Sequence, residues 1–146
     1  MFRGSHITRV DDKGRLKLPA EFKRQIDEEY GGQFYVTSAD GEKAEIHPMR
    51  EWEEFEKKLA RVPRSNPAKQ KILQWLNYFG QTAEMDAQGR VLLPQLLREK
   101  LNLMAEVVVF GSENHLEVMN REAYDKKLSS GPMSAGDWDE LEKYGV

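Results

Sequence analysis

The sequence predicts an α+β fold built from two tandem copies of one small strand-and-helix unit. The first observation behind this prediction is an internal repeat, in which residues 11–19 (DDKGRLKLP) match residues 86–94 (DAQGRVLLP) at an offset of 75. The second is a period of two between polar and apolar residues, best developed in the first copy and typical of a strand with one wet face. The third is a proline in each copy, followed by apolar residues at helical spacing.

The repeat divides the chain into four predicted parts. The first copy is expected over residues 1–60 and the second over residues 78–128. Residues 61–77 are expected to form a linker and a connecting helix. Residues 129–146, which are rich in serine and glycine and then acidic, are predicted to form a flexible or partly helical tail, either mobile or docked as a short helix.

Each copy is predicted to begin with two strands joined by a tight turn. Residues 5–10 are β-capable, and Asp11 opens an Asp-x-x-Gly pattern that is typical of a turn, because Asp can bond the backbone and Gly14 can adopt a positive φ. In the strand that follows, two leucines alternate with Arg15 and Lys17. These two cations are therefore expected to point outward.

A helix is predicted after the second strand of each copy. Pro19 suits the first position of this helix, and a glycine pair ends it. Phe22 and Ile26 form its buried stripe, and Leu97 and Leu101 occupy the same positions in the second copy. The repeat therefore includes the helix as well as the turn.

A hairpin is predicted to follow each helix. In the first copy its strands are residues 34–37 and 44–46, and in the second copy residues 107–110 and 116–119. Each pair of strands is separated by a short segment that contains glycine, which favours a turn.

Two further helices are predicted, one that closes the first copy and one that connects the two copies. Trp52 and Phe55 lie at helical spacing on one of them, and Pro67 starts another that carries Trp75 and Phe79 on one stripe. We interpret these aromatic residues as parts of a core or an interface, because aromatic side chains at helical spacing are rarely platforms for stacking bases.

The distribution of charge distinguishes the two copies. The chain has a net charge of −3 and a pI near 5.7, which argues mildly against a nucleic-acid partner. Residues 1–24 nevertheless carry seven cations against three anions, whereas residues 78–101 carry three of each. We therefore expect the first copy to dominate any contact with DNA.

The paired Asp-x-x-x-Arg signatures, together with the opening MFRG, resemble the MraZ family of bacterial regulators over about residues 1–128. The resemblance implies an α+β fold with a double-psi or swapped-hairpin AbrB-like β-barrel made from two tandem repeats, with flanking helices. It also implies a ring-shaped homo-oligomer that regulates transcription. Such a protein would bind short tandem repeats of double-stranded DNA in the promoter of the division and cell-wall gene cluster.

The resemblance also implies which residues contact DNA. The motif arginine is the expected contact, and carried over by position it is Arg15, which we predict to read bases because its guanidinium matches guanine. The other candidates are cations near the two turns that would position the DNA backbone: Arg3, Arg9, Lys13, Lys17 and Arg90. The residues expected to structure the turns are Asp11, Gly14, Asp86 and Gly89. A competing interpretation is that Arg15 pairs with Asp11 and only stabilises the corner.

Nothing in the sequence predicts an enzyme. His6, His47 and His115 are far apart, so a metal site would need three unrelated loops to converge. The sequence also lacks a glycine-rich phosphate loop and a serine nucleophile motif. We expect no catalytic residue, metal, cofactor or small-molecule substrate.

Composition predicts a soluble protein of the cytoplasm, and the DNA binding that the resemblance implies would associate it with the nucleoid. No apolar run approaches the roughly 20 residues of a membrane span, the N-terminal segment lacks the apolar stretch of a signal peptide, and there is no cysteine. An alternative function is a ring scaffold or antitoxin-like interaction module whose basic turn meets an acidic partner protein. A scaffold should bind all DNA equally poorly, whereas a regulator should bind its promoter selectively.

Overall fold

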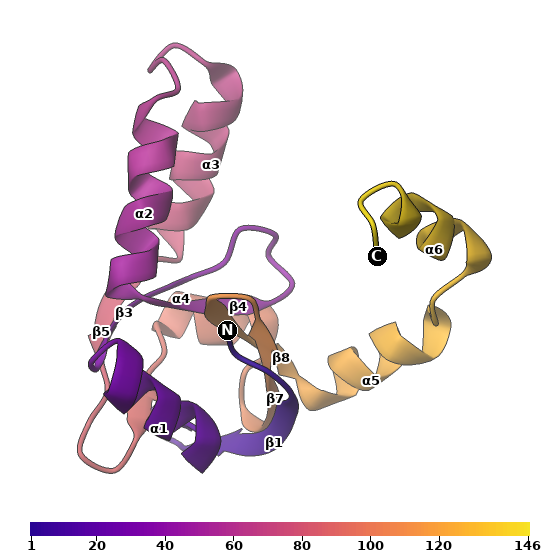
Figure 1. The fold of residues 1–146 in the computed structure, drawn as a ribbon. Helices are drawn as coiled ribbons and strands as arrows, with labels where there is room; N and C mark the ends of the chain where they lie inside the picture. The colour runs from indigo at the N-terminus through magenta and orange to yellow at the C-terminus, as the bar shows by residue number, and fades with distance from the viewer.

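The computed structural model describes all residues 1–146 and contains eight strands and six helices (Figure 1). The strands are β1 (Ser5–Val10), β2 (Arg15–Lys17), β3 (Gln33–Thr37), β4 (Ala44–Pro48), β5 (Gln81–Glu84), β6 (Arg90–Leu92), β7 (Ala105–Ser112) and β8 (His115–Asn120). The helices are α1 (Ala20–Glu29), α2 (Met49–Ala60), α3 (Pro67–Tyr78), α4 (Gln95–Leu101), α5 (Arg121–Ser130) and α6 (Ala135–Glu142). The two hairpins predicted from the sequence are present as β3–β4 and β7–β8.

All eight strands belong to one antiparallel sheet with the order β5-β3-β4-β8-β7-β1-β2-β6. The outermost strands, β5 and β6, lie against each other, so the sheet is nearly closed into a barrel. Closure leaves few unpaired backbone groups at the edges. The expected α+β barrel is therefore confirmed.

The two copies interleave. Strand β1 pairs with β7, β2 with β6, β3 with β5 and β4 with β8. Within the first copy, β1 and β2 meet only where Val10 lies opposite Leu16. Every strand of one copy thus pairs with a strand of the other copy, as the swapped-hairpin resemblance implied.

One hydrophobic core fills the barrel, a cluster of 20 buried residues drawn from both copies. The stripe predicted for the first helix, Phe22 and Ile26, is buried, and so are its counterparts Leu97 and Leu101. The repeated apolar pattern therefore corresponds to one shared core.

Proline precedes both short helices but lies one residue earlier than predicted. Pro19 is the N-cap of α1, with φ −56° and ψ 145°, and Pro94 occupies the same position before α4. The fixed φ of proline suits either position, and here the extended ψ keeps the residue outside the helix. The predicted glycine stop is present, because Gly31 follows α1 with φ +79°.

Helices α2 and α3 form an antiparallel pair that projects from the barrel (Figure 1). Asn66 caps α3 by accepting hydrogen bonds from the backbone N–H groups of the second and third helical residues. Of the aromatic residues predicted to be core, Trp52 and Phe79 are buried, whereas Trp75 is half-buried and Phe55 is exposed.

The C-terminal segment forms a helix that stands apart from the barrel (Figure 1). Ser134 and Asp137 make a reciprocal capping box that starts α6. Trp138, the largest apolar side chain of the tail, is 54% exposed. The tail therefore contains a short helix that is not docked on the barrel. None of the six helices is both long and apolar enough to cross a membrane.

Candidate nucleic-acid interface

The carboxylate of Asp11 holds the first Asp-x-x-x-Arg turn together. Its Oδ1 accepts hydrogen bonds from the backbone N–H of Lys13 at 3.0 Å and of Arg15 at 2.9 Å. Its Oδ2 accepts a third from Nε of Arg15 at 2.8 Å. Gly14 has φ +86°, a left-handed conformation that glycine adopts without strain. The hydrogen bond from the Arg15 backbone is the largest of the effects that lower the pKa of Asp11, so this carboxylate is charged at neutral pH.

The second turn repeats the first almost bond for bond. Oδ1 of Asp86 accepts hydrogen bonds from the backbone N–H of Gln88 and Arg90, both at 2.9 Å, and Oδ2 accepts one from Nε of Arg90 at 2.8 Å. Gly89 has φ +76°. The pKa of Asp86 is lowered, chiefly by the backbone hydrogen bond from Arg90.

The aspartate fixes one edge of each guanidinium and leaves the other free. Within the chain, Arg15 makes its ion pair and its side-chain hydrogen bond through Nε alone. Its side chain is 31% exposed, and no hydrogen bond or ion pair within the chain uses either Nη group. The ion pair between Arg15 and Asp11, which the competing interpretation predicted, is therefore present. It orients the guanidinium and uses only Nε.

Pairing of β2 with β6 brings the two turns to opposite ends of one short ribbon. Leu16 lies opposite Val91 at its centre, and both are buried. The outward positions are Arg15 opposite Leu92 and Lys17 opposite Arg90. The glycine carbonyl of each turn accepts a backbone hydrogen bond from the leucine that follows the other strand, at 2.9 Å in both cases. The turns therefore hold each other in place.

An open depression of about 660 Å³ lies beside the first turn. Two of its lining residues are the carboxylates Asp11 and Asp12. Five are cations: Arg9, Arg15, Lys17, Arg90 and Arg98. This excess of positive charge on a chain of net charge −3 marks the depression as the candidate interface.

Arg98 is a cation that the sequence analysis did not single out as a site residue. Its Nε donates a hydrogen bond to the carbonyl of Leu93 at 3.0 Å, and its guanidinium lies directly over Gly14. A Cβ atom on Gly14 would come within 2.4 Å of the Arg98 guanidinium carbon. Lys23 covers Gly89 in the same manner, at the equivalent position of the repeat. The offset of 75 identifies these two cations as equivalent positions, but only the fold places them over the turns.

The sequence of this chain matches one family model over residues 1–74 and 80–137, and that family is described as "MraZ protein, putative antitoxin-like". The chain belongs to the MraZ family. It is 58% identical to the protein named Transcriptional regulator MraZ of Acidobacterium capsulatum, over the whole of both chains. It is 50% identical to the protein of that name from Koribacter versatilis, again over both whole chains. A third, from Syntrophobacter fumaroxidans, is 32% identical over 87% of this chain and 84% of its own length.

In this MraZ-family chain the structure places two of the predicted contacts outside the depression. Lys13 is exposed at the tip of the first turn and does not line it. Arg3 lies in a separate depression beside α1, which it shares with Arg24 and three glutamates. Arg9, Arg15, Lys17 and Arg90 are the predicted cations that the fold brings together.

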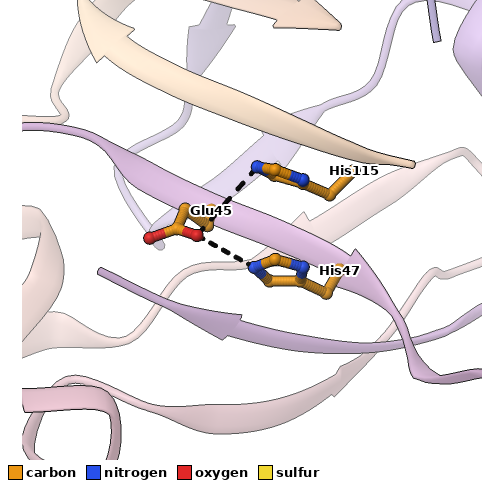
Figure 2. A group of neighbouring side chains, drawn as sticks. All are labelled: Glu45, His47 and His115. Atoms are coloured by element: carbon orange, nitrogen blue, oxygen red, sulfur yellow. Dashed lines mark hydrogen bonds and ion pairs between the residues drawn. The ribbon is translucent and has the colours of Figure 1, made fainter. Parts of the chain in front are cut away.

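The structure corrects the argument that was made against a metal site. Convergence of three loops is not needed, because His47 lies on β4 and His115 on the neighbouring β8, and their rings stack with centroids 4.4 Å apart (Figure 2). His6 is elsewhere, with Nε2 3.5 Å from Glu21. Burial lowers the pKa of His47. Burial by itself would raise the pKa of Glu45, but hydrogen bonds from His47 and from a backbone N–H outweigh it, so that this pKa is lowered.

Proposed function

We propose that this chain is a sequence-specific regulator of transcription that binds double-stranded DNA through the depression beside its first turn. The observation that carries the proposal is the gathering of five cations in one depression beside the first turn. The names of its relatives support regulation of transcription. The resemblance adds the target, which is the promoter of the division and cell-wall gene cluster with its short tandem repeats.

Within this interface Arg15 has the geometry of a base reader. Asp11 fixes Nε, so the two Nη groups are presented in one orientation, and a planar guanidinium can donate two hydrogen bonds to O6 and N7 of guanine. Arg9 has a side chain that is 70% exposed, and Lys17 is also exposed. These two side chains are suited to phosphate contacts, which set position and affinity.

Several chains acting together would make the contact strong. One depression offers only a few phosphate contacts, which gives weak binding at physiological salt. A ring-shaped homo-oligomer on tandem DNA repeats would raise the effective concentration of each further depression, and avidity would follow. Such binding would also hold the protein at the nucleoid.

The alternative function is a ring scaffold or antitoxin-like module. The description of the matched family includes the term antitoxin-like, and the net charge of −3 is unusual for a protein that binds DNA. An acidic partner protein could occupy the same cationic depression. Selectivity between DNA sequences separates the two functions, because a scaffold has no reason to discriminate.

The experiment is a binding titration with two DNA fragments of equal length and composition, one carrying the tandem promoter repeats and the other scrambled, at several salt concentrations. We expect wild-type protein to prefer the repeats and to lose affinity steeply with salt. Arg15→Ala should lose about 10- to 100-fold on the repeats. Arg61→Ala, which removes the same charge from an exposed position at the end of α2, is the matched control and should bind like wild type. Equal binding of both fragments by the wild-type protein would favour the scaffold.

A further inference from the structure

The outer face of the sheet carries a cluster of ionisable side chains where β4 and β8 pair (Figure 2). Glu45 and His47 are two residues apart on β4 and therefore point to the same face. Glu117 lies opposite Glu45 in the register, and continuing that register places His115 opposite His47. Two strands from different copies thus bring two imidazoles and two carboxylates together.

Three of these side chains bring their ligand atoms close together. Nε2 of His47 lies 3.1 Å from Oε1 of Glu45, and Nε2 of His115 lies 4.0 Å from the same oxygen (Figure 2). The ligand atoms of all three residues lie within 4.8 Å of one another. Two atoms bound to one zinc ion at 2.0–2.1 Å with tetrahedral angles would be about 3.4 Å apart. Binding one ion would require the stacked imidazoles to turn so that both ring nitrogens point at it, which would also bring the observed spacing to that value.

The surroundings suit a cation that enters from solvent. The side chains of Glu45, His47 and His115 are 15%, 14% and 21% exposed, so the cluster is largely shielded but reachable. Trp52 of α2 covers one side, with its ring centroid 4.8 Å from that of His47. Apart from the histidines, the charged groups that face the cluster are Glu117, whose Oε2 lies 3.1 Å from Nε2 of His115, and Lys43, whose Nζ lies 3.5 Å from Glu117. Two carboxylates against one ammonium leave the cluster negative.

We propose that Glu45, His47 and His115 bind one zinc ion per chain, with the fourth position open to water. Two imidazoles and one carboxylate are a ligand set that zinc accepts. The ion would tie β4 of the first copy to β8 of the second and so strengthen the interleaved barrel.

The sequences of β4 and β8 explain why the sheet offers one zinc site and not two symmetric ones. Glu45 and Glu117 face each other at the centre of the strand pair, with the two histidines on one side of them. On the other side the same register places Lys43 and Met119, a cation and a thioether. Lysine cannot bind the ion while it is charged, so the second half of this pseudo-symmetric face is closed to zinc.

The test is a zinc titration by calorimetry of the full chain, prepared without a polyhistidine tag and stripped with a chelator. We expect one ion per chain, and we expect His47→Gln and His115→Gln each to weaken binding by at least about 10-fold. His6→Gln is the matched control and should bind like wild type. Retention of wild-type affinity by both variants, or the absence of stoichiometric binding by the wild-type protein, would overturn the proposal.

A second measurement does not depend on the variants folding. Cobalt(II) added to the stripped wild-type protein should give the intense visible absorption of a four-coordinate ion, and added zinc should remove it. Zinc should also raise the Tm of the wild-type protein by several degrees, because a ligand that binds only the folded state stabilises it. Only a weak spectrum typical of hydrated cobalt would contradict the site.

Discussion

The two Asp-x-x-x-Arg turns of this chain have the same backbone and different neighbours. Each aspartate accepts the same three hydrogen bonds, and the corresponding distances agree within 0.1 Å. At the offset of 75, however, Arg9, Lys13 and Lys17 of the first copy become Glu84, Gln88 and Leu92 in the second. The shape of the turn is thus set by aspartate and glycine, whereas its chemistry is set by the residues around it. The second copy can therefore contribute mainly to the barrel, while the first copy also offers cations to a ligand.

The largest expected effect compares the two motif arginines in DNA binding. Arg15→Ala should weaken binding to the tandem-repeat fragment by about 10- to 100-fold, because it removes a base contact from the more cationic turn. Arg90→Ala should weaken it by less than about 5-fold, as expected for a lost phosphate contact. Titrations at one salt concentration measure both. Equal losses of affinity would mean that the two turns contribute equally to DNA binding, contrary to the difference proposed here.

The turn glycines should differ in folding stability. Gly14→Ala forces a Cβ atom into a left-handed conformation and against the Arg98 guanidinium, and should cost about 2–3 kcal/mol in the free energy of unfolding. Gly89→Ala meets only the flexible stem of Lys23 and should cost about 1–2 kcal/mol. Urea denaturation measures both. Gly4→Ala, at φ +85° with no atom near its Cβ, is the control for the conformational cost alone.

The two turn aspartates should respond alike to acid. The folded-state pKa of each is lowered, so each stabilises the fold above its unfolded pKa of about 3.9, and that stability is lost as the pH falls through the folded pKa. Asp11→Asn and Asp86→Asn should each lower the stability at pH 7 and reduce the further loss between about pH 5 and pH 3. Thermal unfolding across this range is the measurement. A smaller loss of stability between these pH values in only one of the two variants would show that the turns are not equivalent in structure.

The smallest expected effect comes from placing a lysine in the second copy at a position where the first copy already has one. Leu92 is 55% exposed on the outer face opposite Arg15, at the position that corresponds to Lys17. Leu92→Lys should raise the affinity for DNA a few-fold and steepen the dependence of log affinity on log salt by about 0.9 per chain. Leu92→Gln, which adds polarity without charge, should change neither quantity. No change in the salt slope with lysine would mean that this end of the ribbon faces away from DNA.

The local parts of the fold were predictable from the sequence, and the long-range parts were not. The Asp-x-x-Gly turn, the alternation around Leu16 and the helix stripe of Phe22 and Ile26 each depend on residues close together in the chain, and the structure has all three. The pairing of β2 with β6 depends on which copy supplies the partner strand, and no local pattern states that. It was expected only because the repeat resembles a known family.

The candidate sites show the same division. Arg15 and Arg90 were expected because the repeat places them at matching positions, and Lys17 because it lies two residues after Arg15. Arg98 joins them only because α4 of the second copy packs over the turn of the first. His47 and His115 meet because of the register between β4 and β8, two strands from different copies. That register is fixed by the closure of the whole barrel, so the sequence analysis could not bring these histidines together.

The most direct test of the central claim is the selectivity of Arg15→Lys, measured as the ratio of its affinities for the tandem-repeat fragment and for the scrambled one. Lysine keeps the charge but loses the planar pair of donors that matches guanine. We expect affinity for scrambled DNA to stay within about 2-fold of wild type, and the ratio to fall by about 10-fold or more. A ratio equal to that of the wild-type protein would contradict the claim that this guanidinium reads the DNA sequence.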